Sequence, residues 1–128
     1  MIQLDALNTP TVILSVDVYV KQPQRTQVSL DSMAQIAVDG NNTGATTFEE
    51  TYEILRNDVV IATINDLMDY EGANFGRHTN FPNFPLVDDN PSARINKYEL
   101  RVTRVAPDTG VIFIFVASRS LKATVFTA

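Results

Sequence analysis

The sequence contains no cysteine, no tryptophan and a single histidine, His78. Without cysteine, the chain can form no disulfide, thiolate zinc site, iron–sulfur cluster or cysteine nucleophile. A single histidine excludes any site that needs two imidazoles, and no Gly-x-Ser-x-Gly motif accompanies it. Because these absences remove most common means of catalysis, we expect a protein that is not an enzyme and holds no cofactor.

Positive charge is also scarce. The 128 residues include 10 Lys and Arg against 15 Asp and Glu, and the resulting net charge of −5 disfavours a nucleic-acid partner. No apolar run approaches the ~18 residues of a membrane span, and the first residues lack the basic and apolar regions of a secretory signal peptide. We therefore expect no membrane partner, and synthesis in a cytoplasm without a cleavable signal peptide.

Alternation of apolar and polar residues is the main pattern that is present. Residues 11–20, 27–38, 47–56, 98–103 and 121–126 alternate in this way, which predicts half-buried strands. The apolar runs 59–64 and 111–116 predict two more, and the second is apolar on both faces, as in a central, buried strand. Asn57 and Asp58 tolerate left-handed conformations, so they predict a type I′ hairpin turn.

These patterns predict an all-β fold. We expect an antiparallel sandwich of two sheets, jelly-roll-like or immunoglobulin-like, with about seven to nine strands. Residues 1–9 would form an N-terminal arm and residues 10–128 a single domain. Residues 66–93 are rich in Gly, Pro and Asp, so they predict a long loop of a kind that often carries function, with a short strand at 69–71.

The most distinctive string of this loop runs from Phe81 to Leu86. Two prolines make it stiff and extended, and they present Phe81 and Phe84 at fixed positions. The two rings could fold back as a lid over one end of the sandwich. They could also dock on a neighbouring subunit, where aromatic residues concentrate as anchors.

The same loop is rich in oxygen ligands. Asp66, Asp69, Asp88 and Asp89 could contribute to a calcium site, which requires six to eight oxygens. Their spacing matches no EF-hand, and solvated loop carboxylates explain them better than a calcium site does. We therefore predict no metal.

The N-terminal arm carries apolar residues that a free tail would not need, namely Ile2, Leu4 and Leu7. Either the arm docks on its own sheet, or it adds a strand to a neighbouring copy.

Charge is also divided along the chain, with 13 acids and 4 bases in residues 1–89 and 2 acids and 6 bases in residues 90–128. Acidic and basic strands could pair within one chain. Alternatively, basic residues such as Arg101 and Arg104 would orient one copy against the acidic surface of another.

Five short strings resemble small, cysteine-free exosporium and coat-associated proteins of the spore surface in Bacillales. They are Val28-Ser-Leu-Asp31, Thr51-Tyr-Glu-Ile-Leu-Arg-Asn57, Val60-Ile-Ala-Thr63, Tyr98-Glu-Leu-Arg101 and Ser118-Arg-Ser-Leu-Lys-Ala-Thr124. The resemblance implies a jelly-roll-like sandwich with a structural role, made in the mother cell and partnered by itself and other spore-surface proteins. A weaker likeness links the chain to spore appendage subunits, which lock together through cysteines, and to the middle hairpin of fibronectin type III modules.

Two functions of different classes follow from these observations. The first is a structural protein that self-assembles in a spore outer layer or extracellular fibre, through strand addition by residues 1–9 and contacts of Phe81 and Phe84. The alternative is a monomeric immunoglobulin-like or carbohydrate-binding module with its ligand site in loop 66–93. A phage or virion structural protein would have the same composition.

Overall fold

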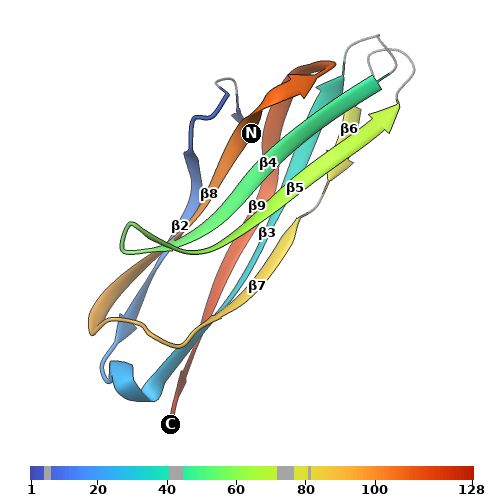
Figure 1. Cartoon of the computed structure of the whole chain (residues 1–128). Helices are drawn as coiled ribbons and strands as arrows, with labels where there is room; N and C mark the ends of the chain where they lie inside the picture. Colours follow the sequence, from blue (N-terminus) through green and yellow to red (C-terminus); the bar gives the residue numbers. More distant parts are fainter. Residues whose placement is uncertain (5–6, 41–44, 72–76, 81) are drawn as a thin grey trace.

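The computed structural model describes residues 1–4, 7–40, 45–71, 77–80 and 82–128, with only the backbone for residues 69–71, 77, 78, 80 and 106. Nearly all of the described chain is extended (Figure 1). The strands are β1 (Ile2–Gln3), β2 (Thr11–Val20), β3 (Thr26–Gly40), β4 (Ala45–Arg56), β5 (Val59–Glu71), β6 (Arg77–Asn80), β7 (Asn83–Asp88), β8 (Arg94–Thr109) and β9 (Val111–Thr127), with a short 3₁₀ turn η1 (Pro23–Arg25) after β2.

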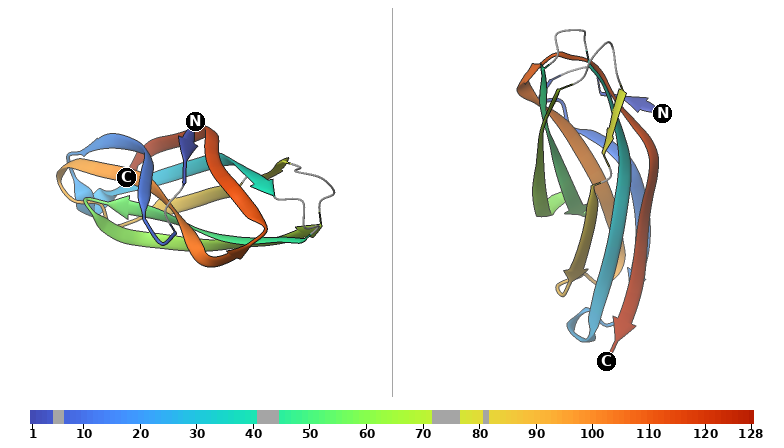
Figure 2. Two further views of the ribbon diagram at one scale, coloured as in Figure 1. Left: turned by 90° about the horizontal axis from the view of Figure 1, so that it is seen from above. Right: turned by 90° about the vertical axis from the view of Figure 1, so that its right-hand side faces the viewer.

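Two antiparallel sheets form the predicted β-sandwich. One sheet has the order β1-β9-β3-β6, with β7 also paired to β3, and the other has the order β2-β8-β4-β5. The two layers face each other along their length (Figure 2). No helix in the described part of the chain is long and apolar enough to cross a membrane.

The core lies between the sheets and is built by the inward faces of the long strands. Every second residue of β3 and β4 is buried, as the alternation predicts. The largest fully buried apolar side chains are Phe48, Tyr52, Tyr98, Leu30, Ile36, Ile54, Leu100 and Ile114.

The hairpin between β4 and β5 is confirmed. Asn57 and Asp58 have φ angles of 49° and 69°, and both central positions of a type I′ turn require positive φ. Asn57 also accepts a hydrogen bond on Oδ1 from the amide of Lys97, at 2.9 Å, which ties the turn to β8.

The prediction of a long loop over residues 66–93 is wrong. Strand β5 continues to Glu71, and β6 and β7 occupy much of the rest. The alternation of β5 persists because Ile64, Asp66 and Met68 remain paired with residues of β4. Strand β7 accommodates Pro85 because it is an edge strand that pairs only with β3.

Strand β9 also differs from prediction. Residues 111–116 and 121–126 belong to one continuous strand, because the segment between them stays paired with β3 through a register shift. Its upper end is not the buried, central strand that the apolar run predicts. Ile112 and Phe113 are 39% and 42% exposed, and β1 pairs with Phe115 and Val116 rather than with these two residues.

Candidate functional site

The N-terminal segment, residues 1–4, lies along residues 114–116 of β9, here called the upper edge of β9. Strand β1 pairs Ile2 with Val116 and Gln3 with Phe115, and the amide of Leu4 donates to the carbonyl oxygen of Ile114 at 2.8 Å. Leu4 is only 3% exposed and belongs to the hydrophobic core. Residues 1–4 therefore fill a slot on the sandwich with backbone hydrogen bonds and one apolar anchor.

Arg104 of β8 fixes the end of this segment. Its Nη1 donates to the carbonyl oxygen of Leu4 at 3.2 Å, and its Nε donates to Oδ2 of Asp108 at 2.6 Å. Its carbonyl oxygen accepts from the amide of Asn8 at 2.6 Å. The guanidinium is 9% exposed, so its charge is satisfied by the carboxylate of Asp108 inside the fold.

A buried carboxyl group lies on the strand beside Arg104. Glu50 of β4 is opposite Arg104 in the register and is completely buried. Its Oε2 accepts a hydrogen bond from the hydroxyl of Tyr52 at 2.8 Å, while its Oε1 has no hydrogen-bond partner among the described residues. Burial raises the pKa of Glu50 to about 8, with a further upward contribution from Asp66 and downward ones from Tyr52 and Arg104.

The strand pattern contains a signal for Glu50 that the sequence analysis did not use. The face of β4 that buries Phe48, Tyr52 and Ile54 also includes position 50, because strand side chains alternate with period two. A carboxylate on an apolar face indicates either a buried partner or a raised pKa. In this protein the buried Glu50 has both features, a hydrogen bond from Tyr52 and a raised pKa.

The other predicted contact residues lie in different places. Ile2 is half-buried against the core, whereas Leu7 is 43% exposed. Arg101 is paired with Glu53 inside its own sheet, with Nη2 and Oε1 separated by 2.9 Å. Phe81 lies outside the described residues.

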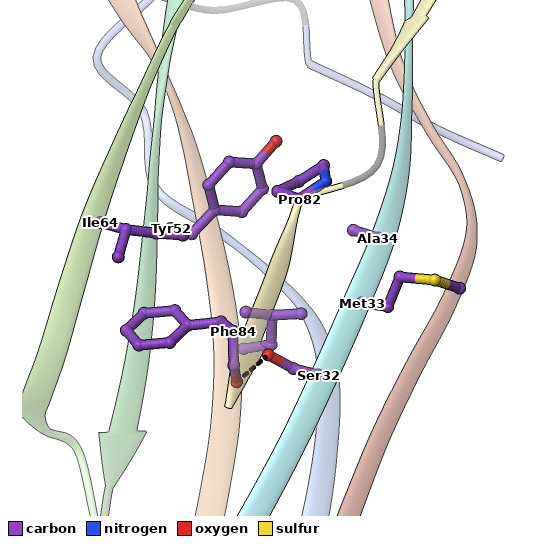
Figure 3. A pocket seen from close by; sticks show the side chains of 8 residues that line it. Ser32, Met33, Ala34, Tyr52, Ile64, Pro82 and Phe84 are labelled. Atoms are coloured by element: carbon purple, nitrogen blue, oxygen red, sulfur yellow. Dashed lines mark hydrogen bonds between the residues drawn. The ribbon is translucent and has the colours of Figure 1, made fainter. Parts of the chain in front are cut away.

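Phe84 points between the sheets, as a lid on the protein's own sandwich would. Its ring lies beside Tyr52 and Ile64 (Figure 3), and its carbonyl oxygen accepts from Oγ of Ser32 at 3.1 Å. Pro82 is held in turn by the amide of Ala34, which donates to its carbonyl oxygen at 3.2 Å. The cavity left among these residues measures about 10 Å³, about enough for one water molecule.

The predicted metal candidates do not come together. Asp66 lies in β5 opposite Glu50. Asp88 is buried beside Arg56, which is six residues farther along β4 than Glu50, or about 20 Å in a strand. Asp88 accepts from Nη1 of Arg56 and from the hydroxyl of Tyr98, each at 2.6 Å. Asp89 is exposed, and the side chain of Asp69 is outside the described part. Within that part, no group of three or more possible ligands gathers.

A groove of about 340 Å³ lies at the opposite end of the molecule, between the ends of β2 and β9. Tyr19, Val125 and Thr127 are among its lining residues, and Tyr19 is 63% exposed. Higher up, Nε of Arg119 donates to the carbonyl oxygen of Ile13 at 2.9 Å and joins β9 to β2. The sequence analysis assigned no role to this surface.

Comparison of the chain with protein-family models and with curated proteins finds no match.

Proposed function

We propose that the protein is a non-enzymatic structural subunit that assembles with copies of itself, and that residues 1–4 dock on a neighbouring copy as they dock on their own sandwich. The observation that carries this proposal is the slot on β9. Three kinds of contact hold the segment there: the pairing of β1, the burial of Leu4 and the hydrogen bond from Arg104.

Exchange between copies is favoured by the small size of the docked segment. The slot makes the same contacts with residues 1–4 of its own chain and of another. Which of the two segments fills it therefore depends on the protein concentration and on how the segment is connected to its own sandwich. Burial of one leucine is worth roughly 2–5 kcal/mol when judged by truncation to alanine. Undocking such a segment leaves the rest of the core in place.

The other parts of the proposal rest on the sequence. The lack of cysteine and the single histidine support a non-enzymatic role. The resemblance to spore-surface proteins supports a location in a spore outer layer or an extracellular fibre, where other surface proteins would be partners.

Deletion of residues 1–9 tests this function. We expect the truncated protein to remain folded, with an unchanged strand signal in circular dichroism, and to stay monomeric at concentrations where the full chain assembles. Light scattering and negative-stain microscopy of both proteins, over a range of concentrations, measure the difference. Unchanged assembly of the truncated protein would show that the N-terminal segment is not the connector.

A synthetic peptide of residues 1–9 provides a matched control. It should bind to the truncated protein, because the slot on β9 is then empty. The same peptide with Leu4→Asp should not bind, because a carboxylate would replace the buried anchor. If the full chain is a monomer at every concentration, self-assembly itself is excluded.

A further inference from the structure

Strand β5 is a long edge with no partner on one side. Its 13 residues pair with β4, and within the described part of the chain no strand pairs with its other side. Monomeric proteins normally protect such edges with lysine, proline or a bulge. Residues 59–71 contain no Lys, Arg, Pro or Gly. A register shift against β4 lies at Ile61, close to the hairpin, whereas pairing is regular around Leu67, which is 63% exposed on the outer face.

A second unpaired edge lies on the opposite side of the molecule. Residues 121–127 of β9, here called the lower edge of β9, pair with β3, and no other described strand pairs with them. They border the groove near Tyr19, and Val125 and Phe126 are 44% and 58% exposed. The hydrogen bond between Arg119 and Ile13 places β9 beside β2, which is the end of its sheet farthest from β5.

The charges of the two edges are complementary. Strand β5 contains Asp66, Asp69 and Glu71 and no basic residue. The lower edge of β9 contains Lys122 and no acidic residue, and Arg119 precedes it on the same strand. Pairing of β5 with β5 of another copy would bring like charges together, whereas pairing with β9 brings opposite charges together.

We propose that the free edge of β5 in one copy pairs with the lower edge of β9 in the next, so that the copies join head to tail into a filament. Each such contact would continue one sheet into a sheet of the next copy. An interface between two different edges on opposite sides of a subunit does not close on itself as a two-fold dimer does, so it generates a chain of subunits. This inference rests on the proposed self-assembly and names its second contact.

Leu67→Lys tests the β5 edge. Leu67 is exposed, so we expect the variant to fold with a melting temperature close to that of the wild type. A lysine at this edge would face the basic β9 of the next copy, so the critical concentration for assembly should rise by about tenfold or more. Val87→Lys makes the same change at a residue of β7 that is 56% exposed, and it should leave assembly unchanged.

Mixing experiments separate head-to-tail pairing from pairing of β5 with β5. A Leu67→Lys copy keeps its β9 edge, so it can join the exposed β5 of a wild-type filament and then block further growth. Substoichiometric amounts should therefore shorten wild-type filaments in negative-stain images. If β5 pairs with β5 instead, the variant cannot join, filament length stays constant and the proposal is wrong.

The double variant Asp31→Lys with Lys122→Glu tests the β9 edge. Asp31 and Lys122 are opposite each other on the outer face, so the exchange keeps a pair of opposite charges while it places an acid on β9. It should also prevent assembly. Raising the salt concentration from ~50 to ~500 mM should weaken wild-type assembly, because screening removes the attraction between the edges.

The outcomes distinguish this inference from the proposed function. If the wild type assembles and the Leu67→Lys and double variants assemble equally well, the edge contact is wrong while self-assembly stands. If the wild type never assembles, both are wrong.

Discussion

Glu50 is the residue whose chemistry departs most from its surroundings. Its carboxyl group is completely buried, accepts one hydrogen bond from Tyr52 and leaves Oε1 without a hydrogen-bond partner in the part of the chain that the structure describes. With a pKa of about 8, the group is mainly protonated at neutral pH. Arg104 lies opposite Glu50 in the register, and the same Arg104 donates a hydrogen bond to the carbonyl oxygen of Leu4.

The raised pKa makes the stability of the fold depend on pH. Because the folded state holds the proton of Glu50 more tightly than the unfolded state, its stabilising effect is complete below pH 4.5 and is lost as the pH rises toward about 8. The free energy of unfolding should fall by about 1 kcal/mol per pH unit in this window.

Glu50→Gln should remove this contribution. We expect the variant to gain stability relative to the wild type as the pH rises from 5 to 8.5, since its amide does not ionise in this window. Urea denaturation at several pH values measures the difference. A constant difference between the two proteins would show that Glu50 does not titrate in this range.

At the level of elements, the connection between β8 and β9 depends on one glycine. Gly110 has a φ of 73°, and a Cβ at this position would lie 2.3 Å from the carbonyl oxygen of Ala45. Only glycine avoids both the strained backbone and this collision. The turn therefore fixes how the two longest strands are connected.

Gly110→Ala should destabilise the fold by about 1–3 kcal/mol, since the change adds backbone strain and a steric clash. For a domain of this size the melting temperature should fall by roughly 4 °C or more, as measured by differential scanning calorimetry. Thr109→Ala, at the exposed neighbouring residue, is the control and should change it much less. Equal effects of the two substitutions would refute the role of Gly110.

Patterns within a few consecutive residues predict the elements whose structure depends mainly on those residues. The alternation gives β2 with its observed bounds, and the pair Asn57 and Asp58 gives the hairpin. The lengths of β5 and β9 are not predictable in this way, because pairing with β4 and β3 overrides the polar residues within them. Leu4 and Arg104 of the candidate site were singled out by different arguments, both as contacts between copies. Their hydrogen bond within one chain was not foreseeable, because it joins residues 100 positions apart.

For the molecule as a whole, the described strands leave edges of different kinds. The upper edge of β9 is covered by β1, while β2, β5, β7 and the lower edge of β9 each have a side with no described partner. The covered edge relies on a two-residue strand and one buried side chain, so we expect it to open more readily than the long paired strands. The first proposed contact uses the covered edge, and the second joins two open edges.

Hydrogen exchange should show this difference. We expect the amide of Leu4, which donates to Ile114, to exchange about tenfold or more faster than amides in the paired centre of β3. Exchange measured by NMR at a concentration below assembly provides the comparison. Equal protection of the two would show that the segment opens only on global unfolding, and exchange between copies would then lose its physical basis.

The two fully buried tyrosines give the protein an optical signal of its own folding. Tyr52 and Tyr98 each donate their hydroxyl hydrogen to a carboxyl oxygen, of Glu50 and Asp88 respectively. Such hydrogen bonds quench phenol emission, and no tryptophan is present to mask it. Loss of the two contacts should therefore make the chain brighter as it unfolds, so that intrinsic fluorescence reports on both ends of the core without any label.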